Sequence, residues 1–390
     1  MTPKRKIIFV IAMTGIFLIL VGGWLTYRKL IAPALATWRS MPEDISVSRV
    51  TVNKLNLSKK IFLETEYPDE TTDLSINENG SSKSSDLVVV SKVGAMFVDP
   101  DGKMKERISF RADDGESNNS HRRNSRVAHS FIKSVIFKRQ LYGYVTDTTL
   151  IDGTIFINKD GTVAWRFAEG KSVQNAKAVE QSNSDAPEYV VSYGAENGID
   201  LVDSNGRKIK RIADDRAYSL QTIRLKSANE PVIAYLDSGT EHLFVRNLTG
   251  EKLRDFKLPF PFAIFVTCRY PSKDGEYRGL VLKDEKLWIF DFDGNVIATP
   301  DAPLSDKLSD VRATTVKVKE NEAEYLAVTA TFDIRRTVFF LYDSNGNLVY
   351  QEILDDGNGG LLALPSVISD REDLFIATSS KIWRYSLPDQ

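Results

Sequence analysis

The side chains that could carry out chemistry are few in this sequence: three histidines and one cysteine. His121, His129 and His242 are not spaced as metal ligands, and no His-Glu-x-x-His or Cys–His cluster occurs. Cys268 ends the apolar run Phe260–Cys268, so we interpret it as a small buried hydrophobic residue rather than a nucleophile. A glycine-rich phosphate loop and a nucleophile elbow are also absent from the sequence. The sequence therefore favours a non-catalytic protein over an enzyme.

A basic segment, Arg122–Arg139, is the clearest candidate for contact with a partner. Its charge would suit an acidic protein surface or lipid headgroups. The candidate partner-binding residues are Arg122, Arg123, Arg126 and His129. A solvated loop, balanced by the acidic residues in Asp113–Glu116, is the simpler interpretation of the same segment.

Acidic residues recur in short turns such as Asp99–Gly102 and Asp291–Gly294. Their spacing could suggest calcium, but a calcium loop needs further oxygen ligands and an acidic residue near its end. The residues after the second turn, Ala298–Pro300, offer no such acid, and the equivalent turn Asn247–Gly250 contains no aspartate. Hairpin chemistry explains all of these turns. We therefore expect no cofactor, with calcium as the alternative.

The same turns mark an internal repeat, which is the first feature to seek in a long chain. In each copy, two or three apolar residues lead into a polar turn that ends in glycine, and another strand-like run follows. The turn glycines are Gly102, Gly161, Gly206, Gly250, Gly294 and Gly346. In such a turn, the first Asp or Asn can bond its own backbone two residues on, and glycine supplies a positive φ. The period of about 44 residues is typical of a four-stranded propeller blade.

Each repeat predicts at least three strands, and the fourth is expected to be an outer edge strand. A seventh unit, Asp373–Thr378 with Lys381–Leu387, ends the chain without the terminal hairpin. Ring closure explains this if a strand from the start of the domain completes the last blade. Ser46–Leu57 and Ile61–Glu66 are the candidates, and we expect Ser46–Leu57 to join the C-terminal sheet. The sequence thus predicts an all-β propeller of about seven blades, with six or eight as alternatives.

Two polar segments break the period and are interpreted as loops. The first is Tyr67–Ser85, which contains a proline, a glycine and several serines. The second is 111–130, which contains the first part of the basic segment and accounts for most of the longest interval between turn glycines.

The repeats resemble the PQQ-like β-propeller repeats of bacterial quinoproteins, and the closest match is Asp160–Trp165, a small turn before a strand that ends in Trp. The other five turns lack this Trp. Their equivalent residues are Glu106, Lys210, Arg254, Ala298 and Tyr350. The family includes dehydrogenases, which hold their cofactor against an adjacent Cys pair, and inert scaffolds such as the outer-membrane assembly lipoprotein. Because Cys268 stands alone, the resemblance implies the scaffold class. Integrin-type propellers with Asp-rich turns are the alternative.

The N-terminus has the pattern of a membrane anchor. Lys4, Arg5 and Lys6 precede an uncharged stretch, Ile7–Tyr27. As a helix it would be about 31 Å long, which matches a hydrocarbon core of about 30 Å. The positive charge before the stretch favours a cytoplasmic N-terminus. A cleaved signal peptide is the alternative, because Ala34–Ala36 spells a small-x-small cleavage motif.

These patterns divide the chain into a cytoplasmic N-terminus (1–6), a transmembrane helix (7–27), a juxtamembrane linker (28–45) and a β-propeller domain (46–390). The formal net charge is −2, and the chain beyond the basic N-terminus is mildly acidic. This argues against nucleic acid as a partner. We expect a single-pass protein of the bacterial inner membrane, in contact with the bilayer through residues 7–27, with its propeller in the periplasm.

The predicted function is that of a tethered protein-binding or scaffold module whose partner is another protein of the cell envelope. Repeats without catalytic residues, together with the anchor, lead to this expectation. The alternative is a propeller enzyme or a small-ligand sensor that uses the central channel. Aryl-sulfotransfer propellers rely on an active-site histidine, for which His129 is the candidate here.

Overall fold

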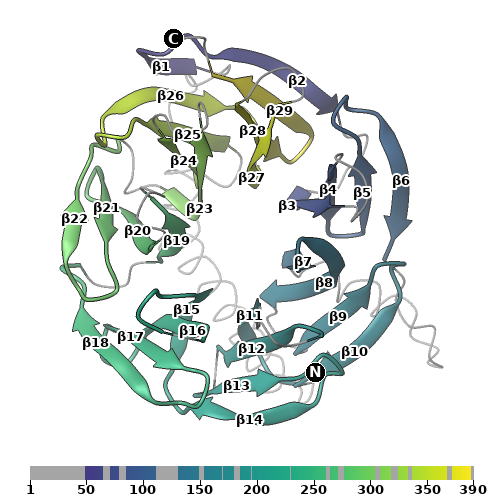
Figure 1. Ribbon diagram of the computed structural model, residues 1–390, viewed down its shortest axis with the longest axis vertical. Coiled ribbons are helices and arrows are strands. Elements are labelled where there is room, and N and C mark those ends of the chain that lie inside the picture. The colour runs from purple at the N-terminus through teal and green to yellow at the C-terminus, as the bar shows by residue number, and fades with distance from the viewer. Residues whose placement is uncertain are drawn as a thin grey trace, which may run out of the picture. The chain divides into compact units, whose positions relative to one another are not determined.

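The computed structural model describes fifteen segments of one compact unit, Ser48–Gln390. They are residues 49–64, 71–78, 85–110, 131–148, 153–168, 170–179, 185–194, 196–228, 230–260, 264–270, 276–303, 308–317, 324–332, 336–366 and 371–387. Their regular elements are 29 β-strands in seven antiparallel sheets, arranged as blades around a centre (Figure 1). The predicted all-β propeller of seven blades is confirmed. The predicted transmembrane segment 7–27 lies outside the described residues, and none of those described forms a helix long and apolar enough to cross a membrane.

The first three blades each consist of four consecutive strands. These are β3 (Thr71–Glu78), β4 (Ser85–Ser91), β5 (Gly94–Val98) and β6 (Met104–Ser109) in blade 1; β7 (Phe131–Phe137), β8 (Gln140–Thr148), β9 (Thr154–Asn158) and β10 (Val163–Phe167) in blade 2; and β11 (Val173–Val179), β12 (Glu188–Tyr193), β13 (Ile199–Val202) and β14 (Lys208–Ala213) in blade 3.

Blades 4 and 5 follow the same plan, whereas blades 6 and 7 each add a strand from the start of the domain. Blade 4 contains β15 (Ala217–Ile223), β16 (Val232–Asp237), β17 (His242–Asn247) and β18 (Lys252–Lys257), and blade 5 contains β19 (Val266–Arg269), β20 (Tyr277–Lys283), β21 (Lys286–Phe290) and β22 (Val296–Ala298). Blade 6 contains β23 (Leu308–Lys317), β24 (Glu324–Phe332), β25 (Arg336–Tyr342), β26 (Leu348–Leu354) and β1 (Arg49–Asn53), and blade 7 contains β27 (Asn358–Pro365), β28 (Glu372–Thr378), β29 (Lys381–Ser386) and β2 (Ser58–Glu64).

The core lies between neighbouring blades, where the middle strands pack on both faces. Every residue of β5 and of β16 is buried. This two-sided burial explains why the middle strands appear in the sequence as continuous apolar runs rather than as alternating patterns. The outer strands are different, since most residues of β6 and β18 are exposed.

The strand that the sequence did not reveal is the innermost one of each blade, not an outer one. The run that follows each Asp-Gly turn is the outer strand, and the first strand of the blade lies nearest the centre (Figure 1). The interpretation of Tyr67–Ser85 as a loop is therefore wrong in part, because Thr71–Glu78 forms β3. β3 contains two Thr, an Asp, a Ser and an Asn among its eight residues, and β11 contains a Gln, an Asn and a Lys among its seven. These two strands lack the apolar pattern by which strands are recognised.

Ring closure by an N-terminal strand is confirmed, and the strand includes residues 61–64 of the second candidate, Ile61–Glu66, rather than the expected Ser46–Leu57. β2 pairs with β29, from Ser58 opposite Ser386 to Glu64 opposite Lys381. The expectation that Ser46–Leu57 joins the C-terminal sheet is wrong, because its strand β1 pairs with β26 in blade 6. Only Lys54–Leu57 separates β1 from β2, so the two strands follow each other along the rim of adjacent blades (Figure 1). β1 covers β26, whose last six residues are buried.

The predicted turn chemistry is confirmed in five of the six turns, and in the sixth Asp160 rather than the first residue, Asn158, accepts the backbone hydrogen bond. Asp99 Oδ1 accepts hydrogen bonds from the backbone N–H groups of Asp101, at 3.0 Å, and Lys103, at 2.8 Å. The first residue of four further turns makes the same pair of bonds. These residues are Asp203, Asn247, Asp291 and Asp343. In these five hairpins the backbone is thus held by one side-chain oxygen of the first turn residue.

Five of the six turn glycines also meet the preceding blade. At Gly161, where φ is +86°, a Cβ atom would lie 2.3 Å from the carbonyl oxygen of Ser109 in β6. At Gly206 it would lie 2.7 Å from the Trp165 ring in β10. At Gly346, where φ is +80°, no atom lies within 4 Å of the position that a Cβ atom would take. Glycine at position 161 is therefore needed for both conformation and packing, and at position 346 for conformation alone.

We expect Gly161→Ala to lower the free energy of unfolding by about 3–4 kcal/mol, because it adds a backbone clash to the strain of a positive φ. Gly346→Ala is the matched control, since it adds a similar strain without a clash and should cost about 1–2 kcal/mol. Denaturant unfolding of the two variants and the parent protein measures the difference. Equal losses would show that the contact between blades 1 and 2 at this turn adds nothing.

Candidate functional site

Polar side chains of the innermost strands join neighbouring blades around the centre. Thr72 Oγ1 in β3 donates to the carbonyl oxygen of Ile132 in β7, at 2.7 Å. Thr222 Oγ1 in β15 donates to the carbonyl oxygen of Ala178 in β11, at 3.1 Å. These hydrogen bonds explain the polar composition of the inner strands, because each strand meets the next through side chains rather than through a shared sheet.

One charged cluster connects three blades at the centre. Asp73 in β3 accepts hydrogen bonds from the backbone N–H of Ser134 in β7, at 2.9 Å, and from its hydroxyl, at 2.5 Å. Arg312 in β23 reaches the same region, with Nη1 3.8 Å from Asp73 and Nη2 donating to the carbonyl oxygen of Thr72 at 3.0 Å. A register shift between Ser309 and Arg312 precedes this contact. The cluster links blades 6, 1 and 2. The opposite charges of Asp73 and Arg312 serve to hold these blades together.

A pocket with a volume of about 440 Å³ opens where the innermost strands of blades 2 to 5 end. Its lining includes the last residue of β7, β11, β15 and β19. These residues are Phe137, Val179, Ile223 and Arg269. Arg224 and Tyr277 also line it. The volume lies in the range of about 300–1,000 Å³ that is typical of ligand sites.

The pocket combines an apolar floor with positive charge. Phe137, Val179 and Ile223 are buried, whereas Arg224 and Arg269 are exposed. The Arg269 guanidinium lies over the Tyr277 ring, 4.8 Å from its centroid, as in a cation–π contact. Among the described residues that line the pocket there is no Asp or Glu. This lining is suited to a group that is part apolar and part anionic.

The four candidate partner-binding residues, Arg122, Arg123, Arg126 and His129, lie outside the described residues. The C-terminal end of the same basic segment is described, and it borders the pocket. Lys138 and Arg139 form the turn between β7 and β8, directly after Phe137, and both have a positive φ. Lys138 Nζ lies 5.3 Å from the centroid of the Phe137 ring.

Sequence reasoning missed Arg224, Arg269 and Tyr277. Arg224 and Arg269 fall in different repeats about one period apart, and neither belongs to a recognisable motif. The only signal that could have found them is their shared position, at or just after the end of an inner strand. Because the inner strands were not recognised, that signal was not available.

Cys268 and His242, two of the residues that could carry out chemistry, have structural roles. Cys268 in β19 is buried, and burial, more than any other effect, raises the pKa of its thiol to about 12. It is a packing residue, as predicted. His242 begins β17, and its Nδ1 lies 2.6 Å from Asp255 Oδ1. Hydrogen bonds from Lys252 and then from His242 lower the pKa of Asp255. No group of three or more His, Cys, Asp or Glu residues suited to a metal ion occurs among the described residues.

Trp165 ends the segment that most resembles a PQQ-like repeat, and it connects blade 2 to blade 3. Its ring stacks on Phe156, with centroids 5.3 Å apart, and its Nε1 donates to the carbonyl oxygen of Ser204 at 3.0 Å. Arg254 occupies the equivalent position two blades later, and its Nε donates to Asp293 Oδ1 at 2.6 Å. Both acceptors belong to the turn of the following blade. Different side chains thus make the same connection, which explains why the Trp is not repeated.

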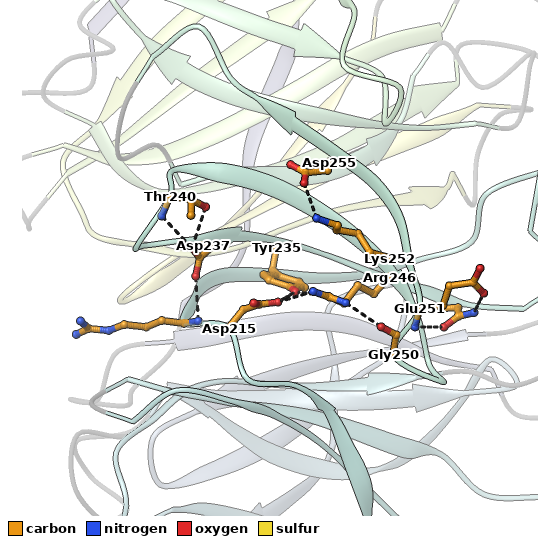
Figure 2. A network of polar contacts seen from close by, with 11 residues as sticks. Asp215, Tyr235, Asp237, Thr240, Arg246, Gly250, Glu251, Lys252 and Asp255 are labelled. Carbon is orange, nitrogen blue, oxygen red and sulfur yellow. Dashed lines mark hydrogen bonds and ion pairs between the residues drawn. The ribbon is translucent and has the colours of Figure 1, made fainter.

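A further polar network joins β16 and β17 of blade 4 to the connection from blade 3 (Figure 2). Arg246 in β17 donates to the Tyr235 hydroxyl at 2.7 Å, to Asp215 Oδ2 at 2.9 Å and to the carbonyl oxygen of Gly250 at 2.8 Å. The Tyr235 hydroxyl also donates to Asp215. Burial first, and then this hydrogen bond, raise the pKa of Tyr235. Tyr235 therefore acts as a structural hydrogen-bond donor at neutral pH.

No protein-family model and no curated protein sequence matches the chain. Among solved structures, it is similar to BBS1N in two crystal structures of BBS1N in complex with ARL6DN, one soaked with mercury and one with lead. The TM-scores are 0.57 and 0.56, and the sequence identities are 9% and 10%. The matches cover 87% and 86% of this chain and 99% and 97% of BBS1N. At this identity the similarity concerns the propeller fold.

Proposed function

We propose that this chain is a membrane-tethered, extracytoplasmic β-propeller that binds proteins as a scaffold module of the cell envelope. The observation that carries the proposal is the pocket at the ends of β7, β11, β15 and β19, with its apolar floor and exposed Arg224 and Arg269. Surfaces that combine aromatic residues and arginine are typical of protein interfaces. BBS1N, a protein of similar fold, is in complex with the protein ARL6DN, which supports the same class of function.

The tether in this proposal is the apolar stretch Ile7–Tyr27. The basic residues before it support a location in a bacterial inner membrane with the propeller in the periplasm. The resemblance of Asp160–Trp165 to the PQQ-like repeats of bacterial quinoproteins supports a bacterial protein. A reporter enzyme fused after Gln390 tests this orientation, because activity confined to the cytoplasm would contradict it.

We expect a photo-crosslinking amino acid at Tyr277 of the full chain to capture one discrete partner protein, since Tyr277 lines the pocket. The same amino acid at Ile209 is the control, because Ile209 is an exposed outer-strand residue. Mass spectrometry identifies the adduct, and the purified partner is then tested for binding to the full chain. Protein binding through this face would be refuted by adducts that are absent at position 277 or identical at both positions.

A small-ligand sensor or an enzyme that uses the channel is the second candidate, favoured by the pocket volume of about 440 Å³. A ligand that binds the folded state raises its stability by RT ln(1 + [L]/Kd). A thermal-shift screen of the full chain with metals, quinones, sulfated aryl compounds and sugars distinguishes this class. A large shift with one compound, together with turnover, would replace the scaffold proposal.

A further inference from the structure

Arg224 and Arg269 occupy corresponding places in neighbouring blades. β15 ends at Ile223 and Arg224 follows it, while Arg269 is the last residue of β19. Both arginines are exposed and both line the pocket. Two positive groups in one pocket repel each other, and an anion between them reverses the sign of that interaction. The charge of the described lining therefore selects an anionic group.

The arginine geometry favours a carboxylate as that group. The Tyr277 ring lies under the Arg269 guanidinium and restricts its orientation. A planar guanidinium held in this way offers two parallel N–H donors, which match the two oxygens of a carboxylate. Lys138, in the turn between β7 and β8, adds a further positive charge beside the pocket.

The remaining lining contributes apolar side chains next to the arginines. Phe137, Val179 and Ile223 form a buried floor, and Pro187 and Pro231 add apolar surface without a backbone N–H donor. Since both arginines are exposed, the pocket is open to solvent on its charged side. Small-molecule sites usually enclose about 70–90% of their ligand. A chain that continues across the face of the ring suits an open pocket better than a small anion does.

We propose that the pocket binds an extended segment of a partner protein, in which an Asp or Glu next to an apolar residue pairs with Arg224 and Arg269. This proposal rests on the proposed protein-binding function and specifies the chemistry of its site. The carboxylate lies between the two arginines, and the apolar side chain enters the floor formed by Phe137, Val179 and Ile223. The segment continues toward Lys138, where further acidic residues add to the affinity.

Selection of phage-displayed random heptapeptides on the full chain tests the proposal. The expected result is enrichment of peptides with an Asp or Glu beside an apolar residue. Fluorescence anisotropy then measures the affinity of the synthetic peptide. The double variant Arg224→Glu/Arg269→Glu should weaken binding at least tenfold, and so should replacement of the peptide's acid by its amide. Arg207→Glu is the matched control, because Arg207 is exposed on an outer turn away from the pocket, and it should leave the affinity unchanged.

The outcomes separate this proposal from the proposed function. Selected peptides that lack an acid, or that bind the double variant as well as the parent, would overturn the acidic-segment proposal while protein binding stands. Failure to select any peptide would also overturn it. Competition with glutarate and with inorganic phosphate forms the small-anion arm. The contrary result is that either compound alone binds as tightly as the peptide and depends on the same arginines. That result would assign the site to a small anion and would also contradict the proposed scaffold function. Matching melting temperatures of all variants exclude misfolding as the cause.

Discussion

Deletion of residues 58–64 should abolish the cooperative unfolding transition of the propeller. These residues form β2, the outer strand of blade 7, and Phe62 and Leu63 pack against the cluster that contains Phe375 and Ile382. The Phe62 and Phe375 rings meet edge to face with centroids 4.9 Å apart. Loss of seven paired residues and of this contact removes a large part of a total stability that is only about 5–15 kcal/mol for a typical domain. Denaturant unfolding, followed by intrinsic fluorescence, measures the transition.

Deletion of residues 49–53 is the comparison for this experiment. β1 is the fifth strand of blade 6, so its removal leaves four strands in that blade and keeps the ring closed. We expect a cooperative transition at a lower denaturant concentration, because the buried residues of β26 lose their cover. If the two deletions had equal effects, or if the deletion of 58–64 left the transition unchanged, β2 would not be the strand that closes the ring.

Replacement of Glu352 by Ala should lower the free energy of unfolding by about 3–5 kcal/mol, the usual effect of breaking a buried ion pair on one side. Glu352 in β26 is only 1% exposed, and its Oε1 lies 2.5 Å from Lys59 Nζ in β2. Its Oε2 accepts hydrogen bonds from the hydroxyls of Tyr350, at 2.9 Å, and Tyr385, at 2.8 Å. Burial first, and then the charge of Glu352, raise the pKa of both tyrosines, so they remain donors at neutral pH.

Glu251→Ala is the matched control for Glu352→Ala. Glu251 is exposed and accepts one hydrogen bond from Asn247 Nδ2, so its loss should change the free energy of unfolding by no more than about 0.5 kcal/mol. Denaturant unfolding of both variants supplies the comparison. If the loss of Glu352 cost no more than the loss of Glu251, the buried contacts between blades 6 and 7 would not stabilise the closed ring.

The parts of the fold that the sequence predicted are those built by local chemistry. The turn at Asp99–Gly102 can be recognised because an Asp oxygen and a glycine with positive φ act within five residues. The seventh blade could be inferred from the strand-like runs Asp373–Thr378 and Lys381–Leu387. The sequence could not show which N-terminal strand completes that blade, since β1 and β2 both have strand-like patterns. The choice depends on which outer strand each one covers, and this involves residues about 300 positions away.

The candidate site was less predictable than the fold because no single segment contains it. Lys138 belongs to the basic segment that the sequence did single out. Arg224 and Arg269 are each an ordinary exposed residue at the end of an inner strand, and those strands were missed. Their polar residues, such as Thr222 in β15, are used for contacts between blades. Only the register of four blades around one centre brings these strand ends to the same pocket.

The pairing of Ser58 with Ser386 also has a consequence for how the chain is made. Contacts between residues about 330 positions apart give a high contact order, which slows folding. Ribosomes add about 5–20 residues per second, so β2 emerges roughly 15–70 s before β29. Blades 1 to 5 consist of consecutive strands and can pair as they appear. Blade 7 cannot, and until β29 has been synthesised β2 has no strand to pair with, for a time that the rate of translation determines.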